Sequence, residues 1–317
     1  MTVSVESTSN GTGNGNAKAS SPTRLYSGSL DGFRSTVLEP VIGNEFPKGS
    51  INFVGDILNA LNAEERIRDL AILRTHPQLG ALAGCPKEHG LHIHPVVNDV
   101  RKFGDLDPKI STINSLEPRK LYKGAYGKLA AIQHSDIGFE KAPSDFSALR
   151  LTLLPPTGGD TLWASDGFHR VAEARGLGLY EKPRGSPLSV GSELASDHPV
   201  VRTNPIVGWK SIFPVGTFPK KVNGLTTRKS ENLLNYFYDL ITYGHDLQVR
   251  FKWNEPNDIA IWDNRSVFHT ATFDYDGIGE QSGNCAVGIG EVPYFDPASR
   301  LRREDLGIED QLSPVHL

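Results

Sequence analysis

The chain has 317 residues, of which 38% are hydrophobic and 22% are charged, a balance typical of a globular protein. Its formal net charge of -4 argues against a general affinity for nucleic acid or anionic lipid, so the expected partner is a small molecule. The two cysteines, Cys85 and Cys285, form no CxxC pair, and no run of about 18 apolar residues could span a bilayer. Because no secretory or transit signal is recognisable, we expect a cytoplasmic protein; whether it forms a homo-oligomer stays open.

Residues 1–24 are rich in Gly, Asn, Ser and Thr and contain almost nothing that could be buried. Burial then cannot offset the entropy cost of ordering such a segment, so we expect a disordered N-terminal tail. From residue 25 onward the composition is globular, and no later linker or repeat divides the chain. We therefore expect a single domain over residues 25–317.

Two segments are predicted to be helices. In residues 62–73, NAEERIRDLAIL, Asn62 can cap the helix and Glu65 has the capping-box position. The second lies in SENLLNYFYDLITYG, residues 230–244, where Gly244 is placed to end it. Apolar residues fall on one face of each helix, namely Ile67, Leu70 and Leu73 in the first and Leu233, Leu234, Phe237, Leu240 and Ile241 in the second.

Strands are predicted directly after the second helix. Residues 247–253, LQVRFKW, alternate apolar and polar side chains, the pattern of a half-buried strand. Residues 259–264, IAIWDN, form a short apolar run suited to a buried strand, and the Gly and Pro spacing elsewhere indicates many short strands. The expected fold class is mainly β with peripheral helices, an antiparallel sandwich or jelly roll.

The stretch QHSDIGFE sets His134 and Asp136 two residues apart, so both side chains lie on the same face of an extended strand. By itself this pair is weak evidence, and an ordinary surface or core-edge pair explains it better than a metal site does. A third ligand candidate is His269, which follows the apolar run IAIWDN. Two histidines and one carboxylate suit non-haem Fe(II), because three protein ligands leave adjacent positions open.

Several blocks of the sequence resemble the Fe(II)- and 2-oxoglutarate-dependent dioxygenases of the TauD/TfdA type, in particular their fungal sulfonate dioxygenase branch. The resemblance implies a double-stranded β-helix in which His134, Asp136 and His269 bind iron. The blocks follow the family order from about residue 40 to residue 300: GLHIHPVVN, HSDIGFEKAPSDFSALRLTLLPPTGGDTLWAS, HPVVRTNPIVGWKSIF, VNGLT, DLQVRFKW and NDIAIWDNRSVFHTATFDYDG.

The resemblance implies roles for further residues. Thr161 matches a threonine that hydrogen-bonds the 2-oxoglutarate carboxylate, whereas His94 and Phe213 match substrate-pocket residues. A zinc site built from Cys85, His89, His92 and His94 is the other interpretation of that histidine cluster, although its spacing fits no usual structural zinc pattern.

The chain departs from the family after the distal histidine. Two arginines are usual there, one that holds the distal carboxylate of 2-oxoglutarate and one that can hold an anionic substrate. Gln281 and Cys285 take these two positions, and no Arg or Lys lies between His269 and Arg300. A neutral glutamine can donate a hydrogen bond but cannot neutralise a carboxylate, and the loss at Cys285 argues against a sulfonate substrate.

The scaffold is also expected to be shorter than usual, with a strand and helices missing around residues 74–90 and 162–187. The expected activity is that of a non-haem Fe(II)- and 2-oxoglutarate-dependent dioxygenase, an oxidoreductase that hydroxylates or desaturates a small organic molecule. Gln281 and Cys285 are then the residues facing cosubstrate and substrate. Two alternatives stay open, an iron enzyme that does not use 2-oxoglutarate in the usual way and a catalytically silent family member.

Overall fold

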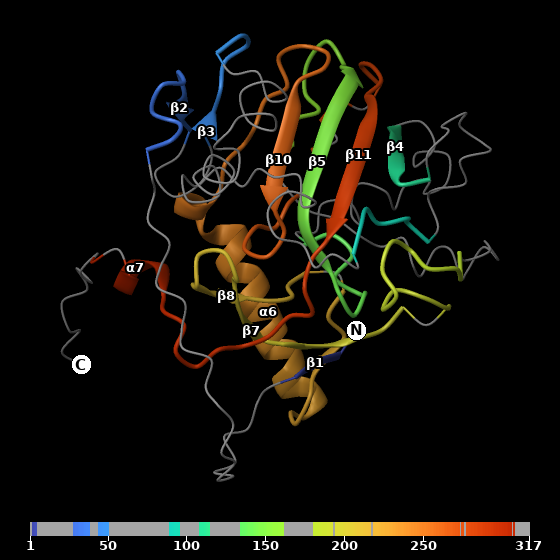
Figure 1. The fold of residues 1–317 in the computed structure, drawn as a ribbon, viewed down its shortest axis with the longest axis vertical. Helices are drawn as coiled ribbons and strands as arrows, with labels where there is room; N and C mark the ends of the chain where they lie inside the picture. Colours follow the sequence, from blue (N-terminus) through green and yellow to red (C-terminus); the bar gives the residue numbers. More distant parts are fainter. Residues whose placement is uncertain are drawn as a thin grey trace.

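The structure of the protein, a computed structural model, describes residues 2–4, 28–38, 44–50, 89–95, 108–114, 134–161, 180–192, 194–216, 218–272, 274–275, 277–305 and 307. These residues contain many short strands and few helices (Figure 1). The mainly β class expected from the sequence is therefore confirmed. The predicted helix at 62–73 lies outside the described residues, as does most of the two segments expected to be short.

Four strands form an antiparallel sheet in the order β10-β5-β11-β4. Their bounds are Ile110–Asn114 for β4, Ser144–Leu153 for β5, Ile259–Asp263 for β10 and Ser282–Ile289 for β11. Strand β10 confirms the apolar strand predicted at IAIWDN. Trp262 pairs with Ser147 across β10 and β5, and Cys285 pairs with Leu149 across β11 and β5. Because strand side chains alternate, these four share one face of the sheet, called the inner face below.

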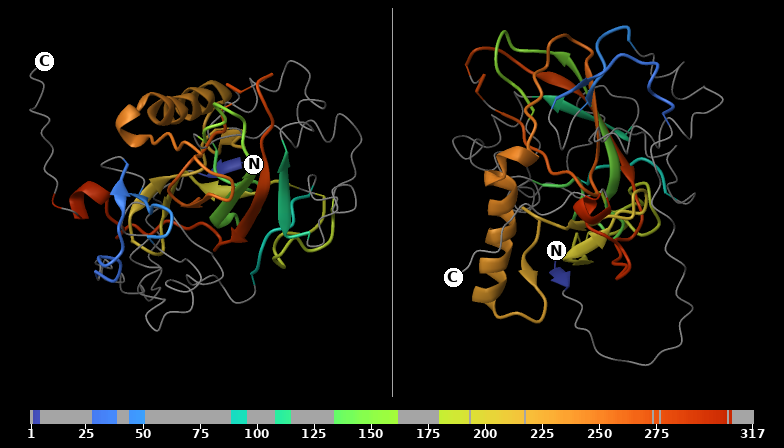
Figure 2. Two further views of the ribbon diagram at one scale, coloured as in Figure 1. Left: turned by 90° about the horizontal axis from the view of Figure 1, so that it is seen from above. Right: turned by 90° about the vertical axis from the view of Figure 1, so that its left-hand side faces the viewer.

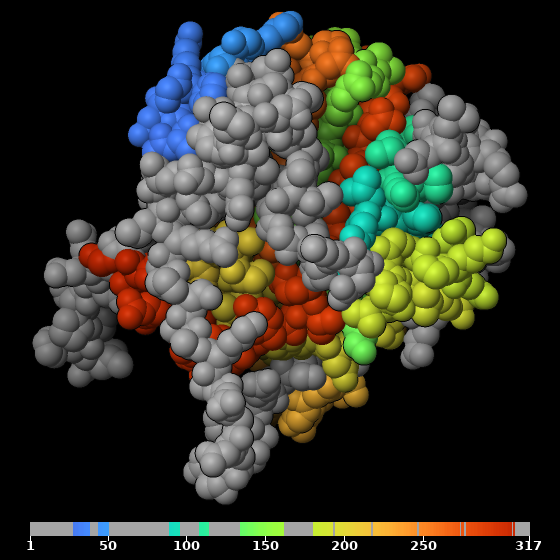
Figure 3. All heavy atoms as spheres, in the orientation of Figure 1, coloured from blue at the N-terminus to red at the C-terminus, as the bar shows by residue number. Residues whose placement is uncertain are grey.

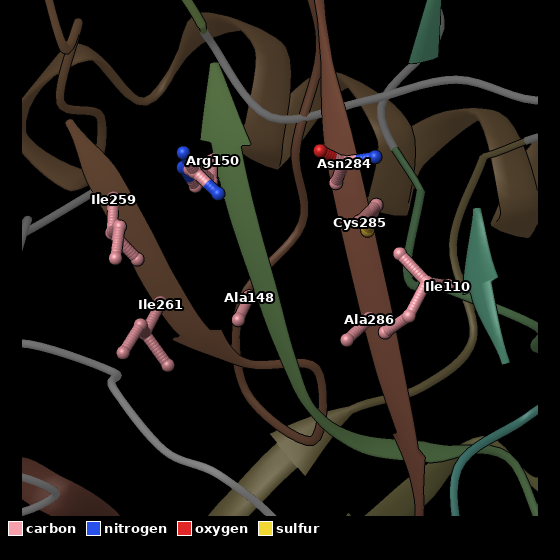
Figure 4. A pocket seen from close by; sticks show the side chains of 8 residues that line it. All are labelled: Ile110, Ala148, Arg150, Ile259, Ile261, Asn284, Cys285 and Ala286. Carbon is pink, nitrogen blue, oxygen red and sulfur yellow. The ribbon is translucent and has the colours of Figure 1, made fainter. Parts of the chain in front are cut away.

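The opposite face carries an apolar hollow. Figure 4 shows its lining, which comes mainly from alternate residues of β10, β5 and β11. Arg150 and Asn284 are the polar residues of this lining. Cys285, which lies between Asn284 and Ala286 in β11, also borders the hollow. Atoms of β5, β11 and β4 can be seen side by side at the surface in the space-filling view (Figure 3).

Three isolated bridges form a second layer against the inner face. His134 pairs with His269, Thr161 pairs with Ala271, and Thr161 also pairs with Phe251, all antiparallel. The chain segments around residues 134, 270, 161 and 251 thus lie side by side in that order. His134 and Asp136 lie on one segment of this layer, and His269 lies on the neighbouring segment.

The prediction of a continuous strand at LQVRFKW, residues 247–253, is wrong. Leu247 ends the short 3-10 helix η2, His245–Leu247, and residues 248–253 contribute a single bridge, at Phe251. A ladder requires a partner strand along its length, and among the described residues the backbone of Phe251 bonds to that of Thr161 alone. The alternation itself survives further on, because Trp253 is buried whereas Arg250 and Lys252 are exposed.

Smaller sheets flank the main one. Within the tail expected to be disordered, Thr2–Ser4 forms strand β1, which pairs in parallel with β6 and β9. The expectation of a disordered tail stays a prediction, because residues 5–24 lie outside the described residues. The remaining strands are β2 at Thr36–Val37, β3 at Asn44–Glu45, β6 at Asp197–Pro199, β7 at Val201–Thr203, β8 at Lys210–Ile212 and β9 at Lys221–Val222.

The long helix α6, Thr227–Tyr243, confirms the second predicted helix, and Gly244 is its C-cap. A side chain at residue 244 would place its Cβ 2.6 Å from the carbonyl oxygen of Leu240, which explains the glycine. Figure 2 shows α6 along the boundary of the described part of the molecule in both views. The short helix α7 covers Arg302–Asp305. Neither helix is long and apolar enough for a membrane span, nor is any other helix in the described residues.

A small apolar core lies directly behind the HxD turn. It consists of buried side chains from that turn, from a loop and from β11, with two half-buried side chains packed against them: Ile137, Phe139, Ala142, Leu194 and Ile289, then Phe218 and Val287. The packing of this core fixes the turn that carries Asp136, because a residue in a close-packed interior has little freedom to move.

Candidate metal centre

The backbone brings the three predicted ligands together. The amide of His269 donates a hydrogen bond of 2.9 Å to the carbonyl oxygen of His134, within the bridge that joins their segments. Their ring centroids lie 4.3 Å apart. Asp136 follows His134 by two residues, so its side chain returns to the same side of the chain.

The side chains then converge on one point. Asp136 Oδ1 lies 3.5 Å from His134 Nε2 and 3.5 Å from His269 Nε2. One ligand atom from each residue lies within 4.8 Å of the other two, and no further group of three such residues occurs in the part of the chain that the structure describes. Three donors this close together face a common point at which a single ion could be held.

Residues of the main sheet hold the carboxylate in this orientation. The hydroxyl of Ser147 donates a 2.6 Å hydrogen bond to Asp136 Oδ2, which leaves Oδ1 directed at the histidines. Asn264 Oδ1 accepts the backbone amide of Asp136 at 2.9 Å, and Asn264 Nδ2 donates to Ser147 Oγ at 2.8 Å. The side chain of Asn264 thereby joins the end of β10, the centre of β5 and the HxD turn.

The protonation states suit a cation. Burial lowers the pKa of His269 to about 3, partly offset by the charge of Asp136. Burial alone would raise the pKa of the Asp136 carboxyl, but His269, His134 and Ser147 together lower it below its ordinary value. At neutral pH the centre therefore offers an ionised carboxylate and a neutral His269 imidazole, the forms that bind metal ions.

A second buried cluster anchors the turn after Asp136. Ile137 has a φ of 44°, a left-handed conformation that is strained for a β-branched residue. Three residues later, the Glu140 carboxylate binds Arg184 and lies 3.1 Å from His92 Nε2. All three side chains are buried, so the turn is held by charge pairing as well as by apolar packing.

The two predicted cosubstrate residues are both buried near one loop. The hydroxyl oxygen of Thr161 accepts a 2.7 Å hydrogen bond from Trp253 Nε1. Gln281 Nε2 donates a 2.7 Å bond to the carbonyl oxygen of Gly159. Thr161 also pairs with Ala271, two residues from His269, so it is a direct neighbour of the histidine segment.

Two of the three predicted substrate residues feel the charge of Asp136, and the third does not contact this site. His94 is half-buried, and burial together with the charge of His92 lowers its pKa to about 3, with Asp136 among the charged groups acting on it. Cys285 is on the inner face, where burial and the charge of Asp136 raise the pKa of its thiol well above the ordinary value. Phe213 is instead 1% exposed, with its ring 5.5 Å from that of His198 and 4.7 Å from the Arg202 guanidinium.

The histidine cluster considered for zinc takes other partners. His92 is directed at Glu140, and His89 Nδ1 lies 2.7 Å from the carbonyl oxygen of Gly290. Cys85 lies outside the described residues. The contacts of these two histidines therefore give no support to the zinc interpretation.

No sequence pattern predicted a site role for Ser147, Asn264 or the Glu140–Arg184 pair. The alternation in SDFSALRL could have placed Ser147 on the face of Leu149 and Leu151, had that segment been assigned as a strand. The role of Asn264 depends on contacts across 128 and 117 residues of chain, to Asp136 and Ser147, which no local pattern reveals.

A β-scaffold that presents two histidines and one carboxylate to a single point is the arrangement of mononuclear non-haem metal oxygenases. Comparison with known proteins leads to the same class of enzyme. The model of the family described as "Taurine catabolism dioxygenase TauD, TfdA family" matches residues 67–283. The chain therefore belongs to the TauD/TfdA family of dioxygenases.

Individual relatives extend over most of the chain. The alpha-ketoglutarate-dependent dioxygenase btcD of Neocamarosporium betae is 38% identical, over 87% of this chain and 96% of its own length. A putative alpha-ketoglutarate-dependent sulfonate dioxygenase of Schizosaccharomyces pombe is 30% identical, over 74% of this chain and 61% of its own. The crystal structure of a taurine dioxygenase from Burkholderia xenovorans superposes with a TM-score of 0.55 at 27% identity, over 85% of this chain and 93% of that one.

Proposed function

We propose that the protein is an Fe(II)- and 2-oxoglutarate-dependent dioxygenase that hydroxylates or desaturates a small organic molecule, with His134, Asp136 and His269 as the iron ligands. The convergence of these three side chains carries the proposal. We further propose that the four-stranded sheet and the bridged layer are the two halves of a double-stranded β-helix within one domain.

The residues present fit ferrous iron. Two imidazole nitrogens and one carboxylate oxygen are a preferred donor set for Fe(II), and their common side leaves the opposite side for further ligands. Bound there, iron supplies the activation of O2, with the 2-oxo acid as reductant. The chain contributes orientation, because Ser147 fixes the second carboxylate oxygen, and it shields the ligands, because Trp262 and Phe218 pack on the two histidine rings.

The fit to 2-oxoglutarate rests on neutral donors. The Thr161 hydroxyl accepts from Trp253, which leaves its own hydrogen to donate to a carboxylate. The Gln281 amide donates to the carbonyl oxygen of Gly159, the residue two positions before Thr161, so the two side chains lie at the same loop. We propose that these two groups hold the distal carboxylate, more weakly than an arginine would, because neither carries a charge.

The substrate is proposed to be uncharged or weakly charged. On the inner face, Cys285 is a neutral thiol where the family usually has an arginine, and His94 is neutral at physiological pH. Neither group can neutralise a sulfonate or sulfate. The names of some relatives refer to sulfonates, but we do not transfer that substrate class to this chain.

Anaerobic titration tests the proposal. The protein is expected to bind one equivalent of Fe(II) and, on addition of 2-oxoglutarate, to develop the weak visible charge-transfer band of the iron chelate. Asp136→Asn and His269→Ala are expected to lose both, whereas His245→Ala, a change at an exposed histidine of η2, retains both. Iron without the band would support an enzyme that uses a different reductant, and absence of iron binding would support a silent member.

A further inference from the structure

Arg250 connects two aspartates that lie on different segments of the chain. Its Nε donates to Asp160 Oδ2 at 2.7 Å, and its Nη2 donates to Asp274 Oδ2 at 2.8 Å. The arginine side chain is 53% exposed, so these ion pairs add little to the stability of the whole fold. A planar guanidinium that binds two carboxylates at once nevertheless fixes their positions relative to each other, which a point charge does not do.

Both ends of this bridge are attached to the loop at residues 158–161. Asp160 belongs to the loop itself. At the other end, Asp274 Oδ1 accepts the backbone amide of Gly159 at 2.9 Å. That bond is the main reason why the pKa of the Asp274 carboxyl lies below its ordinary value. Arg250 therefore closes a ring of contacts that begins and ends on neighbouring residues of one loop.

The same loop contacts both groups proposed to hold the cosubstrate. Thr161 is its last residue, and the Gln281 amide donates to the carbonyl oxygen of Gly159 at 2.7 Å. The backbones of Thr161 and Phe251, the residue after Arg250, bond in both directions, at 3.1 and 3.3 Å. A shift of the loop would therefore move the Thr161 hydroxyl and the hydrogen-bond partner of Gln281 together.

We propose that Arg250 is a positioning residue for 2-oxoglutarate, which fixes the loop at residues 158–161 so that neutral donors can hold a carboxylate without the usual arginine. This inference rests on the function proposed above. Neutral hydrogen bonds are individually weak, and they give useful affinity only where the donors are held in place before the ligand arrives. Arg250 acts through the loop, since its Nε and Nη2 donate to Asp160 and Asp274.

Long-range attraction between Arg250 and an anionic cosubstrate is the competing explanation. The bridge contains one guanidinium and two carboxylates, so it carries one more negative than positive charge. Such a group does not attract an anion at a distance, and exposed charges are also screened by salt. The charge balance thus favours positioning over attraction.

Calorimetric titration of the Co(II)-loaded protein with 2-oxoglutarate gives the first test. Arg250→Ala is expected to weaken binding about tenfold, roughly the cost of ordering one free side chain, while the affinity for Co(II) stays the same. Arg250→Lys is expected to lose nearly as much, because an ammonium group lacks the planar fork that holds both carboxylates. The matched control is Lys252→Ala, which removes a positive charge from an exposed residue of the same segment and leaves the affinity for 2-oxoglutarate unchanged.

The outcomes separate this inference from the proposed function. A wild-type protein that binds Co(II) but not 2-oxoglutarate would overturn both. Full 2-oxoglutarate affinity in Arg250→Ala would overturn the positioning role alone. An equal loss in Lys252→Ala would assign the effect to charge, and an equal loss of Co(II) affinity in Arg250→Ala would assign it to general destabilisation.

Hydrogen–deuterium exchange of the apoprotein tests the loop without any ligand. The amides of Gly159 and Thr161 donate to Asp274 and to the carbonyl oxygen of Phe251. Both are expected to exchange faster in Arg250→Ala than in the wild-type protein, and at the wild-type rate in the Lys252→Ala control. Unchanged protection of these amides in Arg250→Ala would mean that Arg250 does not fix the loop, whatever its effect on 2-oxoglutarate.

Discussion

Arg184 and Glu140 form a buried bidentate ion pair, with Nε donating to Oε1 at 2.6 Å and Nη2 donating to Oε2 at 3.1 Å. The remaining guanidinium nitrogen donates to the carbonyl oxygens of Tyr180 and Gly191, at 3.1 and 2.7 Å. Glu140 follows the candidate ligand Asp136 by four residues, so the pair connects the 180–191 loop to the metal centre.

Replacing Glu140 by Gln is expected to destabilise the protein by about 3–5 kcal/mol, because the charge of Arg184 would stay buried without its counter-ion. Chemical denaturation of the apoprotein measures the free energy of unfolding. As a matched control, Asp160→Asn weakens the exposed ion pair that Asp160 makes with Arg250 and is expected to cost less than about 1 kcal/mol. Equal losses of unfolding free energy in the two variants would show that burial does not increase the contribution of the Glu140–Arg184 pair to stability.

Buried histidines predict a loss of stability in acid. Burial, followed by the charge of Arg202, lowers the pKa of His198 to about 4. Since the folded state binds this proton less readily than the unfolded state, the contribution is complete above about pH 6.5 and is lost as the pH falls toward 4. The change is on the order of 3 kcal/mol for a shift of this size.

Urea unfolding at a series of pH values measures this loss. His198 Nε2 donates to the backbone carbonyl oxygen of Glu140, a bond that a glutamine amide can also make. The variant His198→Gln is therefore expected to flatten the pH dependence between about 6.5 and 4. A profile that stays as steep in the variant would assign the acid sensitivity to other groups, such as His92, whose pKa is also lowered by burial.

Ser147→Ala removes the hydroxyl that donates to Asp136 Oδ2. Loss of a hydrogen bond to a metal-binding carboxylate typically lowers affinity about 10–100-fold, and we expect a change of that size for Co(II), used as a stable substitute for Fe(II). Isothermal titration calorimetry gives the affinity. Ser144→Ala is the control, because Ser144 is also a buried β5 serine that accepts from Asn264. Its hydroxyl lies 3.4 Å from that of Ser147, so among the described residues it is one contact further from Asp136. If both variants bind Co(II) alike, the Ser147 hydroxyl does not orient the carboxylate.

The local parts of the structure could be predicted from the sequence. Helix α6 and strand β10 follow from apolar periodicity and from a terminating glycine, because both depend on neighbours within a few residues. The segment at 247–253 has an equally good strand pattern, but strand formation also needs a partner strand. In the part of the chain that the structure places, this segment has a single bridge, from Phe251 to Thr161. The periodicity of apolar residues shows which side of a segment is buried, but it does not show whether a partner strand lies beside that segment.

The candidate metal triad could be predicted because histidine and carboxylate are usual metal ligands and His134 and Asp136 have the spacing of one strand face. The side chains around it could not, since Ser147, Asn264 and Arg184 are common residue types whose importance comes from contacts made across the fold. For Phe213, a matching position in the sequence suggested a substrate contact, whereas the structure has its ring packed between His198 and Arg202. A family position therefore predicts backbone location better than it predicts side-chain surroundings.

Gln281→Arg restores the positive charge that the family usually has at this position, and it tests how the cosubstrate is held. The Gln281 side chain already points at the Gly158–Gly159 loop beside Thr161, and a Cβ at Gly159 would approach its Nε2 to 2.7 Å. A guanidinium in the same place could pair with the distal carboxylate, and a charge-assisted pair is worth about 1.5–3 kcal/mol, so we expect roughly tenfold to hundredfold tighter 2-oxoglutarate binding. Calorimetric titration of the Co(II)-loaded protein measures it.

The control for this charge is Glu280→Arg, which introduces an arginine at the exposed neighbouring residue. If long-range attraction alone strengthened binding, both variants would gain affinity and both gains would shrink at high salt. A gain confined to Gln281→Arg and retained in salt would instead locate the carboxylate next to residue 281. Unchanged or weaker binding would mean that the pocket around Gly159 and Tyr275 has closed on the glutamine, so that an arginine no longer reaches the cosubstrate.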